Sequence, residues 1–451
     1  MNEPSTKKSP PLKTNEVVAL ATILAHFAPL LAVVYYLDVA RHVGWVLTLL
    51  ACLTLVGLVI GPRRSRAWLR RTLHAALLRW QLTRAFFHAP GTLREHHPFV
   101  RKVTATLAGD DVTLRLPHGE TLESVQLACA RIAVSLRVRE VRVTRVDASA
   151  HLVQMFIVRR NPFATVRTSA LATRARTTEN YAVTVGVDDS GRDVRVSLHR
   201  HVLLGGEPGA GKSNALQVLL AHCALDPSLV LWLFDGKLVE LSLLEECAYR
   251  FVGPDLDDAI DALEELGALM DERYRVLKAR GQREVSIFSD LARHVVVIDE
   301  LALFVAGPDK ARSQHVTKLL GDLVARGRAA GITVIAATQR PSVDIIPAFL
   351  RDLFSVRWAF RCTTRDASDT VLGAGWASRG YSADVLKMDS PGESFLLSEG
   401  NLPVRLRADY LSDDQIRAIA TRATAARLDW KTRSTRAPRS SGEHDTRPPH
   451  G

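Results

Sequence analysis

Cysteine is scarce and scattered in this chain of 451 residues. No two of the five cysteines form a C-x-x-C pair; they are Cys52, Cys129, Cys223, Cys247 and Cys362. Zinc sites and disulfide frameworks need cysteines at defined spacings, so the sequence favours neither and suits a reducing cytosol. Acidic residues are also in the minority, because 59 lysines and arginines against 48 aspartates and glutamates give a net charge of +11. Such an excess favours a polyanionic partner or an anionic membrane face.

The N-terminal part of the chain changes abruptly from polar to apolar. Residues 1–16 are polar and contain three prolines, which predicts a disordered cytoplasmic arm. Two apolar runs follow at 17–37 and 43–61, each long enough to cross a bilayer. A signal peptide is the weaker interpretation of the first run, because the second run follows at once without a small-residue cleavage site between them. The sequence therefore predicts a transmembrane hairpin over 17–61.

Acidic residues are absent from residues 63–84, directly after the hairpin. Seven arginines lie there: Arg63, Arg64, Arg66, Arg70, Arg71, Arg79 and Arg84. By the positive-inside rule, this basic juxtamembrane segment (62–98) is cytoplasmic, and so are both termini. The prediction is a multi-pass protein of the cell membrane with two spans. Trp68 and Trp80 lie where they could contact the lipid surface, although a topology signal alone is sufficient to explain the arginines.

Residues 99–161 predict a small α/β domain. A helix is expected over 121–136, with Thr121 as its N-cap, and alternating apolar residues predict strands at 112–116, 140–146 and 152–158. No chemistry is visible in this part, so scaffolding is the simplest interpretation, and adaptor or oligomer-contact roles stay open. Residues 162–180, rich in Thr, Arg and Ala, predict a linker into the next domain.

A glycine-rich loop stands between an apolar run at 202–204 and a helical pattern at 214–223. It matches G-x-x-x-x-G-K-[ST], and the order of strand, loop and helix is the one that a phosphate-binding loop requires. Glycines let backbone N–H groups turn towards a phosphate, and the helix N-terminus attracts the same anion. The predicted nucleotide-binding residues are Gly206, Glu207, Pro208, Gly209, Ala210, Gly211, Lys212, Ser213 and Asn214. Lys212 is expected to contact the β- and γ-phosphates of ATP, and Ser213 to bind Mg²⁺.

Two acids follow a strand of four apolar residues at 295–298. Asp299 is predicted to support Mg²⁺ through its waters, and Glu300 to polarise the attacking water as a catalytic residue. A further buried strand at 332–338 ends at Gln339, which is predicted to sense the γ-phosphate. Acids after an apolar strand are common by chance, but here Asp299 stands 299 − 212 = 87 residues after Lys212, a normal spacing for a P-loop ATPase.

Strands and helices alternate throughout this region. The predicted strand at 229–234 and helix at 257–280 lie between the loop and the two acids. Such alternation predicts a parallel, doubly wound α/β sheet that binds ligands at the carboxyl ends of its strands. The predicted nucleotide domain covers residues 181–411, and residues 412–451 predict a short helix and a disordered tail.

Several separated runs in this domain resemble the motifs of the FtsK/SpoIIIE DNA translocases. They are the runs 322–332 (DLVARGRAAGI) and 337–346 (ATQRPSVDII), Asp235-Gly236-Lys237 with Glu240-Leu241-Ser242, and Arg273-Tyr274 before Gly281. The resemblance covers about residues 180–410. It implies a RecA-like motor that assembles as a homo-hexamer, hydrolyses ATP with Mg²⁺ and pumps double-stranded DNA through its central channel. Anchoring in membrane lipid by the predicted hairpin fits the same family.

The sequence departs from the cell-division members of that family. Those members carry four spans, a long linker and usually a C-terminal winged-helix module, whereas two spans, a short linker and about forty residues after Tyr410 are expected here. Where many members have Asp-Ser-Arg-Thr, this chain has Ala-Ser-Asp-Thr at 367–370. The arginine that a subunit offers to its neighbour's nucleotide is therefore sought elsewhere, and Arg379, Arg365 and Arg328 are the candidates.

The compact layout looks more like the transfer proteins of actinobacterial conjugative or integrative elements than like a chromosome segregation motor. Conjugative, intercellular DNA transfer is therefore the predicted function, with chromosome segregation at division as an alternative. A type VII secretion-like ATPase is a second alternative, but those motors typically carry several ATPase domains and this chain has one P-loop. A non-catalytic scaffold is disfavoured by the intact Lys212, Ser213, Asp299 and Glu300.

Overall fold

A computed structural model describes residues 63–436 together with Cys52, apart from gaps at 89–92, 94–95, 147–148, 174–180, 287–289, 340, 343–344 and 399. The predicted arm and hairpin, Cys52 excepted, and the tail from residue 437 lie outside the described residues. No helix in the described part of the chain is both long and apolar enough to span a membrane. The chain divides into a first unit, Met1–Ala105 with Asp111–Met155, and a second unit, Thr106–Asp110 with Phe156–Gly451.

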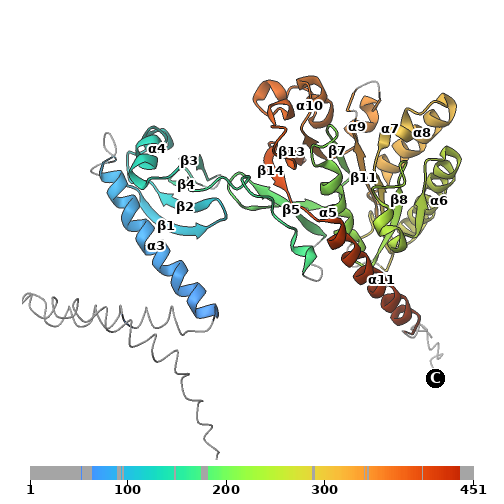
Figure 1. Ribbon diagram of the computed structural model, residues 1–451, viewed down its shortest axis with the longest axis horizontal. Coiled ribbons are helices and arrows are strands. Elements are labelled where there is room, and N and C mark those ends of the chain that lie inside the picture. The colour runs from blue at the N-terminus through green and yellow to red at the C-terminus, as the bar shows by residue number, and fades with distance from the viewer. Residues whose placement is uncertain are drawn as a thin grey trace, which may run out of the picture. The chain divides into compact units, whose positions relative to one another are not determined.

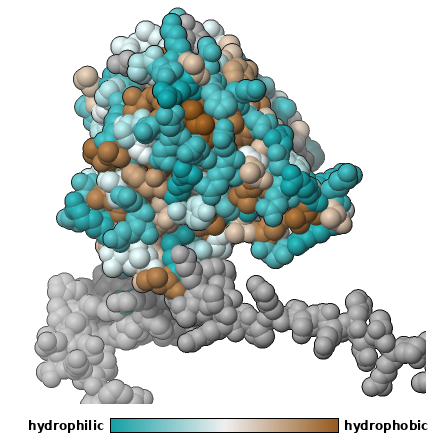
Figure 2. Space-filling view, turned by 90° about the vertical axis from the view of Figure 1, so that its right-hand side faces the viewer, coloured by the Kyte–Doolittle hydropathy of each residue, from teal (hydrophilic) through white to brown (hydrophobic). Residues whose placement is uncertain are grey.

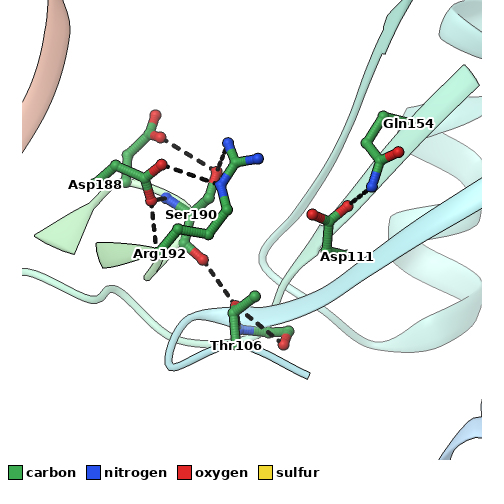
Figure 3. Close-up of polar contacts among 8 residues, drawn as sticks. Thr106, Asp111, Gln154, Asp188, Ser190 and Arg192 are labelled. Carbon is green, nitrogen blue, oxygen red and sulfur yellow. Dashed lines mark hydrogen bonds and ion pairs between the residues drawn. The ribbon is translucent and has the colours of Figure 1, made fainter. Parts of the chain in front are cut away.

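The small sheet has the strand order β1-β2-β4-β3. Its strands are β1 (Phe99–Ala105), β2 (Gly109–Arg115), β3 (Glu140–Arg145) and β4 (Leu152–Val158), accompanied by α3 (Arg63–Phe87) and α4 (Leu122–Leu136) (Figure 1). The helix predicted here is confirmed, because the Thr121 side chain caps α4 by accepting from the Ser124 backbone N–H. The Asp111 carboxylate on β2 accepts a hydrogen bond from the Gln154 amide on β4 (Figure 3).

The second unit is built on a ten-stranded sheet with the order β6-β5-β14-β13-β12-β7-β11-β10-β8-β9. Its strands are β5 (Ala182–Asp188), β6 (Asp193–Ser197), β7 (Val202–Gly205), β8 (Leu229–Phe234), β9 (Arg250–Val252), β10 (Arg293–Ile298), β11 (Ile332–Thr338), β12 (Val356–Phe360), β13 (Glu393–Ser398) and β14 (Val404–Ala408). The predicted strands at 202–204, 229–234, 295–298 and 332–338 are all present. They lie side by side as β7, β11, β10 and β8 (Figure 1).

The prediction of a wholly parallel sheet is wrong for one side of it. Strands β9, β8, β10, β11, β7 and β12 pair in parallel, whereas β13, β14, β5 and β6 continue the sheet in antiparallel pairs. Antiparallel neighbours can be joined by short turns and need no crossover helix. The alternation of strand and helix along the sequence therefore cannot reveal them.

Helices cover both faces of the parallel strands. They are α5 (Lys212–Ala224), α6 (Leu256–Ala279), α7 (Leu301–Val305), α8 (Lys310–Arg326), α9 (Ala348–Asp352), α10 (Arg365–Leu372) and α11 (Asp413–Arg436). Successive residues of β7 point to opposite faces. Leu204 belongs to the core that contains α5 and α11, and Leu203 to the core that contains α6 and α8. The outer face of the second unit near α6 and α8 is mostly hydrophilic (Figure 2).

Helix α11 is longer than the short helix expected at the C-terminus. It runs for 24 residues and is rich in alanine and arginine, which are strong helix formers. The guanidinium of Arg427 donates to four backbone carbonyls, those of Cys223, Ala224, Asp226 and Leu229. These bonds fasten α11 to the end of α5.

Residues 162–173 form a strap on the second unit, in the range where the sequence predicts a linker. Arg167 makes a two-pronged ion pair with the buried Asp409, with nitrogen–oxygen distances of 2.6 and 3.0 Å. Backbone bonds join Arg167 and Ser169 to Tyr410, on both sides of a parallel bridge between Thr168 and Tyr410. The turn between β1 and β2 also belongs to the second unit, and the Thr106 hydroxyl donates to the Ser190 carbonyl at 2.7 Å (Figure 3).

Candidate nucleotide site

The glycine-rich loop follows β7 at the carboxyl edge of the parallel strands, and α5 begins at Lys212. Gly211 has φ +95°, and a Cβ there would lie 2.4 Å from the backbone nitrogen of Gly392. A Cβ on Gly206 would lie 2.6 Å from the Cβ of Phe360. Both positions therefore require glycine, since any side chain would displace the loop from the strands that support it.

Neighbouring segments fix the shape of this loop. The Glu207 backbone N–H donates to the Arg361 carbonyl at 2.9 Å, and the Glu207 carboxylate pairs with the Arg361 guanidinium at 2.6 Å. The Gly392 N–H donates to the Ala210 carbonyl at 2.9 Å. The Asn214 side chain bonds to the backbone of Leu411 through both its amide nitrogen and its oxygen. The side chains of Glu207 and Asn214, both predicted to bind nucleotide, thus hold the loop in place.

Lys212 has a buried side chain, with 2% of its surface exposed. Among the described residues, its Nζ has no hydrogen-bond partner. Burial lowers the pKa of Lys212, whereas the nearby carboxylates of Asp299 and Glu300 act to raise it. A buried ammonium without hydrogen bonds is unfavourable, and phosphate oxygens are acceptors that would remove this cost.

Asp299 follows β10 and is fully buried. Neither of its carboxylate oxygens has a hydrogen-bond partner in the described part of the chain. Burial raises the pKa of Asp299 to about 6, Lys212 lowers it, and Glu240 raises it further. The Ser213 hydroxyl donates to Glu240 Oε1 at 3.2 Å. Two unsatisfied carboxylate oxygens and a hydroxyl suit Mg²⁺, which prefers oxygen ligands and keeps several waters.

Glu300 is oriented by the end of β11. Its carboxylate accepts from the Thr338 hydroxyl at 2.9 Å and from the Gln339 backbone N–H at 3.1 and 3.2 Å. Strands β10 and β11 are parallel neighbours, which brings the two strand ends together. The structure therefore brings Glu300 and Gln339 to one edge, as the sequence predicts for a catalytic acid and its neighbouring sensor.

Two further charged residues, Lys237 and Glu240, lie at this edge, and the sequence motifs assign no role to them. Lys237 Nζ lies 3.9 Å from Asp299 Oδ2 and 3.8 Å from Glu300 Oε2, and Glu240 accepts from Ser213. Both come from the loop after β8, which Asp235 shapes by accepting from the backbone N–H groups of Lys237 and Leu241. Their position in the sequence could have indicated them, because charged residues that follow a central parallel strand lie at the edge of the sheet that binds ligands.

Comparison with known proteins shows what the part of the chain around this site is similar to. Residues 168–295, from the strap to β10, match the model of the FtsK/SpoIIIE family. This match covers less than a third of the chain.

The chain is also similar to curated proteins that are named DNA translocases. The DNA translocase FtsK of Pseudomonas putida is 30% identical over 331 residues, which are 63% of this chain and 38% of the relative. The DNA translocase SftA of Bacillus subtilis is 32% identical over 258 residues, which are 52% of this chain and 26% of the relative. This chain therefore spans well under half the length of these two relatives.

The fold is similar to that of a solved structure, the pCW3 conjugation coupling protein TcpA in monomer form with ATPγS. The TM-score is 0.51 and the sequences are 19% identical. The match covers 77% of this chain and 99% of that chain. This likeness supports a P-loop ATPase fold with a large mixed sheet.

The three candidate trans arginines lie in different places, and all are exposed. Arg365 begins α10 and lies 3.8 Å from Asp384. Arg379 stacks over the Trp376 ring at 4.4 Å. Arg328 precedes β11 at the edge opposite the glycine-rich loop and lines a cleft of about 630 Å³. An arginine that contacts a neighbouring subunit must be exposed. Because all three are exposed, exposure does not distinguish them, and each stays a prediction.

Proposed function

We propose that this protein is a membrane-anchored, hexameric, ATP-driven motor that translocates double-stranded DNA. The observation that carries ATP hydrolysis is the presence of two buried, oppositely charged groups, Lys212 and Asp299, at the ligand edge of the parallel strands. Both lack hydrogen bonds among the described residues, and Glu300 stands next to them. This arrangement suits a Mg²⁺–ATP complex and a polarised water.

Each side chain has its own task in this proposal. Lys212 donates to the β- and γ-phosphate oxygens and stabilises the charge that develops on them. Ser213 and Asp299 would hold Mg²⁺, which would supply further positive charge at these oxygens. Glu300 polarises the attacking water, and its hydrogen bonds to β11 keep its carboxylate oriented. Gln339, at the end of β11, senses the presence of the γ-phosphate.

The cargo is proposed from the relatives and from charge. The two curated relatives described above carry the name DNA translocase. A net charge of +11 suits a channel that follows the phosphate backbone by counterion release, without reading bases. In a hexameric ring the nucleotide lies between protomers, so Arg379, Arg365 or Arg328 would reach the neighbour's ATP.

We also propose the cellular setting. The hairpin predicted at 17–61 anchors the chain in the cell membrane, with both termini and the motor in the cytoplasm. A short basic segment and one small domain separate this anchor from the motor. This compact order supports transfer of DNA between cells over chromosome segregation at division.

The test is the ATPase rate of the full chain, purified in detergent, with duplex DNA, single-stranded DNA or RNA. Duplex DNA should stimulate most, unrelated duplexes should stimulate alike, and affinity should fall steeply with salt. Displacement of a triplex-forming strand measures movement along the duplex. If the tail of a secreted protein stimulates the ATPase and no duplex DNA does, the protein is a secretion motor and not a DNA translocase.

Two variants tie the activity to the site. Lys212→Ala should abolish turnover, and Glu300→Gln should bind ATP but hydrolyse it orders of magnitude more slowly, because each loses a transition-state contact. The exposed Lys310→Ala, at the start of α8, is the matched control and should keep the wild-type rate. Turnover within about threefold of wild type in either site variant would contradict the assignment.

A further inference from the structure

Helix α3 has a second apolar face that the first unit does not bury. Leu78, Leu82 and Phe86 are buried in the unit. On another side of the helix, seven residues follow one another at alternating spacings of four and three: Arg66, Arg70, Leu73, Leu77, Trp80, Arg84 and Phe87. At about 100° per residue they fall within an arc of roughly 100°. We call these seven residues the arginine–apolar face.

Large side chains of this face are open to solvent. The exposed fractions are 42% for Leu73, 54% for Leu77 and 55% for Trp80. The Arg84 guanidinium stacks over the Trp80 ring at 4.8 Å. Exposed apolar and aromatic groups, interleaved with arginines on one side of a helix, are typical of a helix that lies in the interface of a bilayer.

A cleft of about 450 Å³ adjoins the face, between α3 and the end of α4. Arg84 and His88 line it from the side of α3, and Arg137 lines it from the C-cap of α4. Its described lining contains no aspartate or glutamate. Two guanidinium groups without an acid among these lining residues favour an anion, and arginine binds phosphate through a planar fork of N–H groups.

We propose that the arginine–apolar face of α3 lies on an anionic phospholipid surface, and that the cleft takes the phosphate of a lipid headgroup. The described part of α3 has no acidic residue, so its charge is complementary to such a surface. Leucine and tryptophan enter the apolar side of the interface, while the arginines extend to the headgroups. In the sequence, the apolar run 43–61 ends just before α3, which places the helix next to the predicted membrane boundary.

Other occupants fit these residues less well. The alternating spacing also resembles the seam of a helix pair, but arginines fill three of its seven positions and would be buried there without acidic partners. Duplex DNA would pair with the arginines but would leave Leu73 and Leu77 in water. The lipid surface is the occupant that uses both kinds of side chain. The proposal rests on the membrane anchor proposed above, and not on ATP hydrolysis or DNA translocation.

Photo-crosslinking tests it in the full chain, reconstituted in nanodiscs of phosphatidylcholine with or without phosphatidylglycerol. A p-azidophenylalanine replaces Leu77, and in a control it replaces Thr72, which is exposed on the same helix about 140° away. Lipid adducts, detected by mass, should form at position 77 and rise with phosphatidylglycerol. Position 72 should give several-fold fewer. Replacing Arg66, Arg70 and Arg84 with glutamine should make the yield of lipid adducts independent of phosphatidylglycerol. Each arginine is expected to account for a factor of about five in the attraction to the anionic surface.

Three results would overturn the proposal. Equal lipid adducts at positions 77 and 72 would show random collision with the bilayer. Adducts between two protein chains at position 77 would assign the face to an interface between copies. Adducts to added duplex DNA, suppressed by salt, would assign it to nucleic acid. ATPase activity with duplex DNA, measured on the same samples, separates these outcomes from any failure of the motor.

Discussion

The buried Asp299 should make the folded protein less stable at neutral pH, so that replacing it with asparagine stabilises the nucleotide-free chain. The pKa of Asp299 is about 6 in the folded protein, against an ordinary value of 3.8. Between these values the folded state binds more protons than the unfolded state. By linkage, stability then falls as pH rises from 3.8 to 6, and the full cost is present above pH 6.

A shift of about two units corresponds to a free energy of unfolding lower by about 3 kcal/mol. The attraction of Lys212 is already contained in this value, because Lys212 lowers the pKa of Asp299. Asp299→Asn should therefore raise the free energy of unfolding by up to about 3 kcal/mol at pH 8, and by about half as much at pH 5. For a unit of about 300 residues the melting temperature should rise by up to about 5 °C.

The assay is thermal unfolding without nucleotide or Mg²⁺, followed by tryptophan fluorescence at the two pH values. Glu300→Gln is the control, because the Glu300 carboxylate already accepts hydrogen bonds from Thr338 and Gln339, and its neutralisation should not stabilise. Mg²⁺–ATP should reverse the order by stabilising the wild type more than Asp299→Asn. An Asp299→Asn protein that is no more stable at pH 8, or equally stabilised at both pH values, would refute this account.

Two further predictions concern assembly and topology. Mixing Glu300→Gln with Arg379→Ala protein should restore part of the DNA-stimulated ATPase activity, because a mixed ring contains sites with both an intact Glu300 and an intact arginine. If this mixture stays inactive and a mixture of Glu300→Gln with Arg365→Ala protein is active, Arg365 has the role instead. Reporter fusions at residues 14 and 90 should both give a cytoplasmic signal and one at residue 41 an external signal. A cytoplasmic signal at 41 would exclude the hairpin.

The sequence predicts the central strands and the glycine-rich loop well, because both depend on local features. Apolar runs define β7, β8, β10 and β11, and the loop motif fixes the position of Lys212. Parallel pairing then places Asp299, Glu300 and Gln339 at one edge.

The features that the sequence does not reveal depend on distant contacts. The antiparallel strands β13 and β14 pair beside β12 and β5. The charges of Lys237 and Glu240 gain meaning only when β8 is known to lie beside β10. The strap at 162–173 looks like a linker because its partner, Asp409, is more than two hundred residues away.

The strap is one place where a force on the N-terminal side of the chain would reach the second unit. Arg167 and Thr168 join the chain to Asp409 and Tyr410, directly after β14, so part of a force from the N-terminal side would reach the sheet there. From there Ala408 donates to the Gly392 carbonyl, and the Gly392 N–H donates to the carbonyl of Ala210 in the glycine-rich loop. A force on the N-terminal side of the chain would thus act within a few hydrogen bonds of the glycine-rich loop.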